Sequence, residues 1–289
     1  MEQLSSFSRI LHRAGQNEVH RRLEQVAQPF LEGVGFDMTM FIDFLEVVDG
    51  AVIGSLARAF FLLHLPAMND EPALRFVTIT VRAGMMDTAK ARLSVQGYTE
   101  WEEESVLVTA VECVKQVAIG QKVADTNGGI RIRIVESRGH SLLPLAGSPS
   151  TYDTVAFTAT HVYSISPTQF FSNVAIVSRY ATLDDVGRTN PRFRVTMDNG
   201  HWDLHCGHEC PAEWRKFRRS SGMGAFLWRQ DVEDELQGYA PTWDGGEREV
   251  DKAWRALVEA REGIKEARVK FRLLAACDNP ACIHYGDVM

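Results

Sequence analysis

Cysteine is scarce in this 289-residue sequence, with five copies that are unevenly spaced. Small secreted domains held by disulfides carry many cysteines, so that class of protein is excluded. Long apolar runs are also absent. The longest, residues 57–68, is too short to cross a bilayer and contains Arg58 and His64. The N-terminus lacks the apolar centre of a signal peptide, so the sequence predicts a cytoplasmic or nuclear protein with no membrane contact.

An excess of positive charge is lacking too. Lys and Arg number 31 against 38 Asp and Glu, which gives a net charge of −7. That balance argues against nonspecific binding to nucleic acid phosphates. One basic stretch, residues 215–219, lies between Trp214 and Trp228, so nucleic acid contact stays a minor alternative. The composition is otherwise that of a soluble globular protein with ample core.

The first half of the chain alternates helical and extended patterns. Residues 17–31 are typical of an amphipathic helix, and Asp37 is placed to cap a second helix that ends near Val48. A short strand at 51–53 and an apolar helix at 56–65 follow. A strand at 74–81 and a helix at 86–95 complete this order.

The next segment predicts a β-hairpin. Apolar residues alternate over 117–123, and Ile130, Ile132 and Ile134 alternate with arginines after the turn signal at 127–129. Residues 144–180 carry no clear pattern, residues 187–210 are loop-rich, and residues 246–276 predict a long charged helix.

These patterns predict an α/β (α+β) fold with a mixed sheet, flanking helices and a mainly helical C-terminal part. We divide the chain into an N-terminal helix (1–36), a core (37–180) and a loop-rich and helical C-terminal region (181–289).

The turn at Gly54-Ser55, between the first strand and its helix, resembles the nucleotidyltransferase fold. The resemblance is to the divergent members common in mushroom-forming fungi. It covers residues 37–180 and rests more on the order of elements than on any one residue. It implies that the second strand should carry Asp-x-Asp to hold Mg²⁺ and a nucleoside triphosphate. A later Cys-Pro-x-x-Trp-Arg segment of fungal members is matched by residues 210–215.

The acidic residues that the resemblance requires are missing. The Asp-x-Asp positions read Thr78 and Thr80, and Arg133 stands where a third acid is expected. Threonine hydroxyls are weak ligands for Mg²⁺, whereas an arginine at this position repels the metal and binds phosphate oxygens. A second interpretation of each residue stays open. Ser55 is equally explained as a helix N-cap, the threonines as ordinary strand residues and Arg133 as part of a solvated sheet face.

Four of the five cysteines form two closely spaced pairs. Cys206 and Cys210 are spaced C-x3-C, and Cys277 and Cys282 are spaced C-x4-C. Four thiolates can hold Zn²⁺ tetrahedrally, and nearby histidines are alternative ligands: His205, His208 and His284. The other interpretation is a set of reduced thiols that do not meet. Zinc deaminase, metalloprotease and P-loop signatures are absent.

The leading hypothesis is a catalytically degenerate nucleotidyltransferase-fold protein without Mg²⁺-dependent catalysis. It would bind a nucleotide or phosphate, or act as a scaffold for a protein partner. The residues of that pocket would be Gly54, Ser55, Thr78, Thr80 and Arg133. One alternative is an active transferase with displaced acids, such as Asp70 or Glu136. Another is a non-enzymatic interaction module with a structural zinc held by Cys206, Cys210, Cys277 and Cys282.

Overall fold

The computed structural model describes most of the first 178 residues and shorter stretches after them. The described ranges are 2–62, 76–107, 110–122, 130–178, 181–189, 193–197, 205–207, 210, 212, 215–216, 224–229, 270–271 and 277–286. The helices are α1 (Glu2–Arg22), α2 (Gln28–Val34), α3 (Met38–Val47), α4 (Gly54–Leu62), α5 (Met86–Ser94), α6 (Pro167–Phe171) and α7 (Leu183–Thr189). A π-helical turn, η1 (Leu23–Ala27), joins α1 to α2, and two 3-10 turns, η4 (Leu143–Gly147) and η5 (Thr151–Asp153), precede β6.

The strands form one large sheet and two small ones. They are β1 (Ala51–Ile53), β2 (Phe76–Val81), β3 (Tyr98–Glu104), β4 (Val114–Lys122), β5 (Arg131–Ser137), β6 (Val155–Thr158), β7 (His161–Ser164), β8 (Val174–Ile176), β9 (Arg194–Thr196), β10 (Arg215–Lys216), β11 (Gly224–Leu227) and β12 (Lys270–Phe271). The large sheet has the strand order β11-β7-β6-β1-β2-β5-β4-β3. Its β2 and β5 pair in parallel and its other neighbours pair antiparallel, which confirms the predicted mixed sheet.

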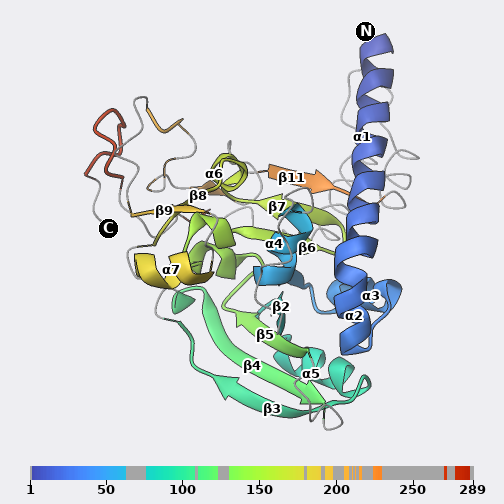
Figure 1. Cartoon of the computed structure of the whole chain (residues 1–289). Helices are drawn as coiled ribbons and strands as arrows, with labels where there is room; N and C mark the ends of the chain where they lie inside the picture. The colour runs from blue at the N-terminus through green and yellow to red at the C-terminus, as the bar shows by residue number, and fades with distance from the viewer. Residues whose placement is uncertain are drawn as a thin grey trace, which may run out of the picture.

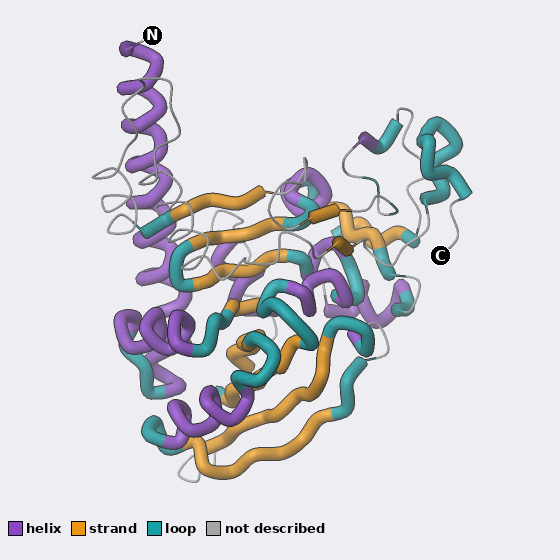
Figure 2. The backbone as a smooth tube through the Cα atoms, turned by 180° about the vertical axis from the view of Figure 1, so that it is seen from behind, coloured by secondary structure: helices purple, strands orange, loops and turns teal. Residues whose placement is uncertain are grey.

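The two faces of this sheet are covered differently. Residues 77, 79 and 81 of β2 enter the larger core, where helices α2 to α5 supply Leu31, Phe41, Leu56 and Leu93. The opposite face carries a smaller apolar cluster that includes Leu145 from η4. Helix α1 runs along one side and its N-terminal end extends beyond the body, while the described C-terminal residues lie on the other side (Figures 1 and 2). No described helix combines the length and apolar character needed to cross a membrane.

Local sequence signals explain several element boundaries. The Asp37 carboxylate accepts the Met40 backbone N–H at 2.8 Å, so it caps α3 as predicted. Gly54 has φ +72°, a left-handed conformation that favours glycine, and it lets the chain turn directly from β1 into α4. The β4–β5 hairpin is confirmed by its antiparallel pairing, although its predicted turn at 127–129 lies outside the described residues.

Three segments differ from the sequence-based expectation. Residues 144–180, left without assignment, contain β6 and β7, which extend the large sheet. Strand β11 then pairs with β7, so the sheet continues past residue 180. Most of the helix predicted at 246–276 lies outside the described residues. For Lys270–Phe271 that prediction is wrong, because they pair with β10 as an extended segment.

Candidate metal centre

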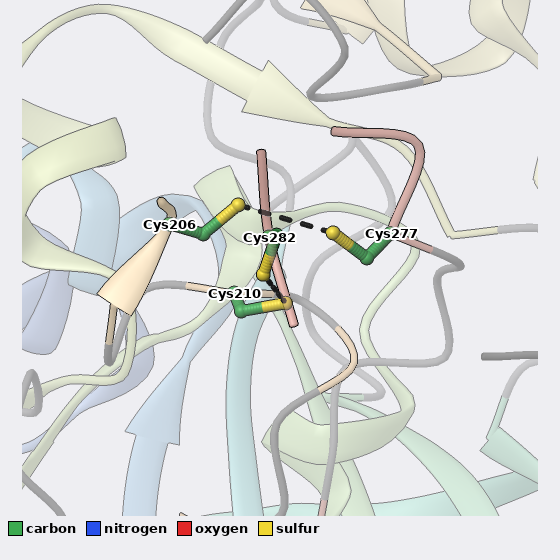
Figure 3. A group of neighbouring side chains, drawn as sticks. All are labelled: Cys206, Cys210, Cys277 and Cys282. Carbon is green, nitrogen blue, oxygen red and sulfur yellow. Dashed lines mark hydrogen bonds between the residues drawn. The ribbon is translucent and has the colours of Figure 1, made fainter. Parts of the chain in front are cut away.

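The four paired cysteines come together in the fold. Each contact between sulfurs joins cysteines that are 71 or 72 positions apart in the sequence. The sulfur of Cys206 lies 3.9 Å from that of Cys277, and the sulfur of Cys210 lies 3.7 Å from that of Cys282 (Figure 3). All four sulfurs lie within 4.8 Å of one another, and all four residues are buried. Of the two interpretations of the cysteine pairs, the structure therefore favours the one in which the pairs meet over the one in which they stay apart.

Tight turns present each pair of sulfurs. The backbone N–H of Cys210 donates to the Gly207 carbonyl at 3.3 Å, and Gly207 takes the left-handed φ of +57°. The Cys282 N–H donates to the Asn279 carbonyl at 3.0 Å. Each turn brings the two cysteines of one segment close together. Closely spaced cysteines of this kind supply half of the ligands of a four-cysteine zinc site.

Asn279 contacts the cysteine cluster through a hydrogen bond to one of its sulfurs. It is fully buried, and its side-chain N–H donates to the Cys206 sulfur at 3.1 Å. Its side-chain oxygen accepts the Ala281 N–H at 2.9 Å, which fixes the amide in that orientation. A donor aimed at sulfur stabilises the thiolate, the form that binds metal. Sequence reasoning missed Asn279, and its only signal was its position between the two cysteines of the second pair.

Burial and close packing oppose the ionisation of these thiols. Burial raises the pKa of Cys206 to about 12 and also raises the pKa of Cys210. Burial opposes ionisation of Cys282 too, but hydrogen bonds from the backbone of His284 and Cys206 lower its pKa to about 7. Closely packed thiolates repel one another, so they ionise together only when a cation compensates their charge.

This donor set fits zinc. Four thiolates at about 2.3 Å from a tetrahedral Zn²⁺ have sulfurs about 3.8 Å apart, close to the two sulfur–sulfur contacts. Among the described residues, these cysteines are the group of side chains close enough to hold an ion. Of the alternative ligands, His205 instead accepts the Gly207 N–H through Nδ1, and His208 lies outside the described residues. A closed set of four thiolates leaves no position for substrate, so a zinc ion held here would be structural rather than catalytic.

The residues of the predicted nucleotide pocket lie on adjacent elements around β2. Thr78 is directly opposite Arg133 of β5 and opposite Ile53 of β1. Gly54 follows Ile53, and a side chain at Gly54 would meet Thr78 at 3.7 Å. Thr80 is fully buried, and its hydroxyl donates to the Ala51 carbonyl at 3.0 Å. The structure thus brings these positions together, but the Thr80 hydroxyl bonds the neighbouring strand β1.

Arg133 and Ser55 both have protein partners. The Arg133 guanidinium pairs with Glu104 at 2.8 Å and stacks over the Phe76 ring at 4.4 Å. The Ser55 hydroxyl accepts from Arg58 at 3.0 Å.

Arg58 is itself held by an ion pair. It contacts Asp153 at 2.6 Å, and Asp153 accepts the Ser150 hydroxyl at 2.8 Å. Sequence reasoning missed Asp153, because Arg58 and Asp153 are 95 positions apart in the sequence and no local signal connects them.

Of the displaced acids, Glu136 lies at the end of β5 and Asp70 lies outside the described residues. Glu136 is almost fully buried. One of its oxygens accepts the Gly84 N–H at 2.5 Å, and the other accepts the Gln116 side chain at 2.6 Å and pairs with Lys115 at 3.2 Å. Each oxygen of Glu136 is therefore engaged within the protein.

Comparison with known proteins gave no matching family model, curated protein or solved structure.

Proposed function

We propose that this protein is a non-enzymatic module stabilised by a structural zinc ion. Cys206, Cys210, Cys277 and Cys282 would hold the ion. The observation that carries the proposal is the convergence of four buried sulfurs from two distant segments. The ion would tie residues 277–282 to residues 206–210. Because such a site does not exist in the unfolded chain, its binding free energy would contribute to folding.

Metal analysis of protein purified without a histidine tag tests this proposal. We expect about one zinc per chain, as for other closed four-thiolate sites. The variant Cys277→Ser should lose that zinc. Cys113→Ser is the matched control, since Cys113 is also buried but belongs to a different apolar cluster. Folded protein without metal after purification under reducing conditions would contradict the proposal.

A degenerate nucleotidyltransferase is the second candidate function, with a scaffold or phosphate-binding role. It is supported by the order β1–α4–β2 and by the register that sets Thr78 opposite Arg133 beside Gly54. Phosphate binding would require Arg133 to leave Glu104, and Glu104→Gln should then strengthen nucleotide binding while Arg133→Met removes it. Titration with labelled ATP measures both effects. Metal-dependent nucleotidyl transfer that disappears in Glu136→Gln would instead favour an active enzyme with displaced acids.

A further inference from the structure

Two sulfur–sulfur contacts in the cysteine cluster each join one segment to the other. Cys206 contacts Cys277, and Cys210 contacts Cys282, at 3.9 and 3.7 Å. We propose that the cluster is a peroxide-sensitive site, at which oxidation expels zinc and forms the disulfides Cys206–Cys277 and Cys210–Cys282. This inference rests on the proposed zinc site and adds a defined pairing of the thiols.

Exposure differs within each of these pairs. Cys206 and Cys282 are 8% and 6% exposed, whereas Cys277 and Cys210 are fully enclosed. In the proposed oxidation, Cys206 and Cys282 are therefore the cysteines that react with the oxidant first, because their residues have more contact with solvent than their partners. Each has an enclosed partner from the other segment next to it, which is the arrangement of an attacking thiolate and a resolving thiol.

The chemistry balances with hydrogen peroxide as the oxidant. The Cys206 thiolate attacks one peroxide oxygen, the O–O bond breaks and hydroxide leaves, which gives a sulfenic acid. The Cys277 thiolate then attacks that sulfur, the S–O bond breaks and a second hydroxide leaves. The second pair repeats these steps. Two peroxides thus accept four electrons from four thiolates, and the products are two disulfides, four hydroxides and free Zn²⁺.

The proposed pairing preserves the link between the two segments after the metal leaves. The disulfides would close loops of 71 and 72 residues. Local pairing of Cys206 with Cys210 and of Cys277 with Cys282 would release the segments from each other. A dithiol reductant and fresh zinc would restore the original site.

Peptide mapping of the zinc-loaded full chain tests the pairing. Hydrogen peroxide is added stepwise, zinc release is followed with a chromogenic chelator, and the protein is then digested with trypsin without reduction. Trypsin cuts after Arg194, Arg215 and Arg272, so the cysteine pairs fall on separate peptides, 195–215 and 273–289. We expect those two peptides to remain joined and one zinc to be released for two peroxides. Separate peptides, each with an internal disulfide, would overturn the proposal, as would zinc retained under excess peroxide.

A second digestion of the joined peptides resolves which cysteines pair across the segments. Endoproteinase Glu-C in phosphate buffer cuts after Glu209 and after Asp278, which separates the two cysteines of each segment. We expect fragments that join Cys206 to Cys277 and Cys210 to Cys282. Fragments that join Cys206 to Cys282 and Cys210 to Cys277 would overturn the assignment. Zinc content measured before oxidation separates the two proposals, because metal-free starting protein refutes the zinc site whatever disulfides then form.

Discussion

The sheet body and the cysteine cluster are stabilised by different means. The body buries apolar side chains on both faces of an eight-stranded sheet, with Phe41, Phe157 and Ile79 in the larger cluster and Leu145 in the smaller one. The third buried cluster of the described residues consists of the four cysteines and Ala212. Each buried methylene contributes about 0.8 kcal/mol, and cysteine acts only as a small apolar residue. Burial of apolar side chains therefore stabilises the body, whereas the proposed zinc ion would supply the folding free energy of the cluster.

The largest expected effect comes from removing a metal ligand. In Cys210→Ser, zinc binding should be lost, which forfeits an apparent binding free energy on the order of 10 kcal/mol. The body has its own core, so it should stay folded. Limited proteolysis should then cleave the C-terminal third much faster, while a fragment near residues 2–178 persists. Cys113→Ser is the control with an unchanged pattern. Equal resistance of Cys210→Ser and the natural sequence would show that the cysteine cluster does not stabilise the C-terminal third.

The stability of the body should be sensitive to the ion pair between Arg58 and Asp153. Both side chains are largely buried, at 11% and 16% exposed. Asp153→Asn keeps the shape but leaves the arginine charge without its partner, so we expect a loss of about 2–3 kcal/mol in the free energy of unfolding. Urea denaturation measures it. Asp43→Asn, at an exposed position on α3, should have little effect. Zinc content should stay the same in both variants, and its loss in Asp153→Asn would show that the two regions are coupled.

The Arg58–Asp153 pair also shows where sequence reasoning stops. Alternation and turn residues predicted β1, β2 and the β4–β5 hairpin, because these signals are local. The sequence did not predict strands β6 and β7. Each has four residues, three of them buried, so it shows no alternation, and Ala159-Thr160 between them is no recognisable turn signal. The cysteine spacing indicated a candidate site. Only the fold could show that segments 71 residues apart meet and that Asn279 lies behind Cys206.

The free energy of unfolding of the body should also depend on pH, because His161 is largely buried. Burial lowers the pKa of His161 to about 4, below its ordinary value of 6.5. Between those values the unfolded chain takes up a proton that the folded chain refuses. The free energy of unfolding should therefore fall by about 3 kcal/mol as pH drops from 6.5 to 4, and His161 should not affect it above pH 6.5.

The variant His161→Gln checks this assignment. Its free energy of unfolding, measured by urea denaturation at several pH values, should vary less between pH 6.5 and 4 than that of the natural sequence. His20→Gln, at an exposed position on α1, should keep the original slope. An unchanged slope in His161→Gln would assign the pH dependence to other groups.

The smallest effect is expected for Asn279, whose side chain donates to the Cys206 sulfur. Asn279→Asp keeps an oxygen for the Ala281 N–H but replaces the donor that faces Cys206. We expect zinc affinity to fall about 10-fold, with no change in the body. Competition with a chelator of known affinity measures this loss. Asp278→Asn, at the exposed neighbouring position, should bind zinc as before. Undiminished affinity in Asn279→Asp would mean that the Asn279 hydrogen bond has no influence on the metal.

X-ray absorption at the zinc edge reports the atoms around the metal, so it distinguishes a four-cysteine site from any other site. For protein loaded with one zinc, we expect four sulfur ligands at about 2.3 Å. Cys210→Ser should lose that signal and Cys113→Ser should keep it. A shell of nitrogen or oxygen ligands, or no bound zinc in the natural sequence, would contradict a structural zinc held by Cys206, Cys210, Cys277 and Cys282.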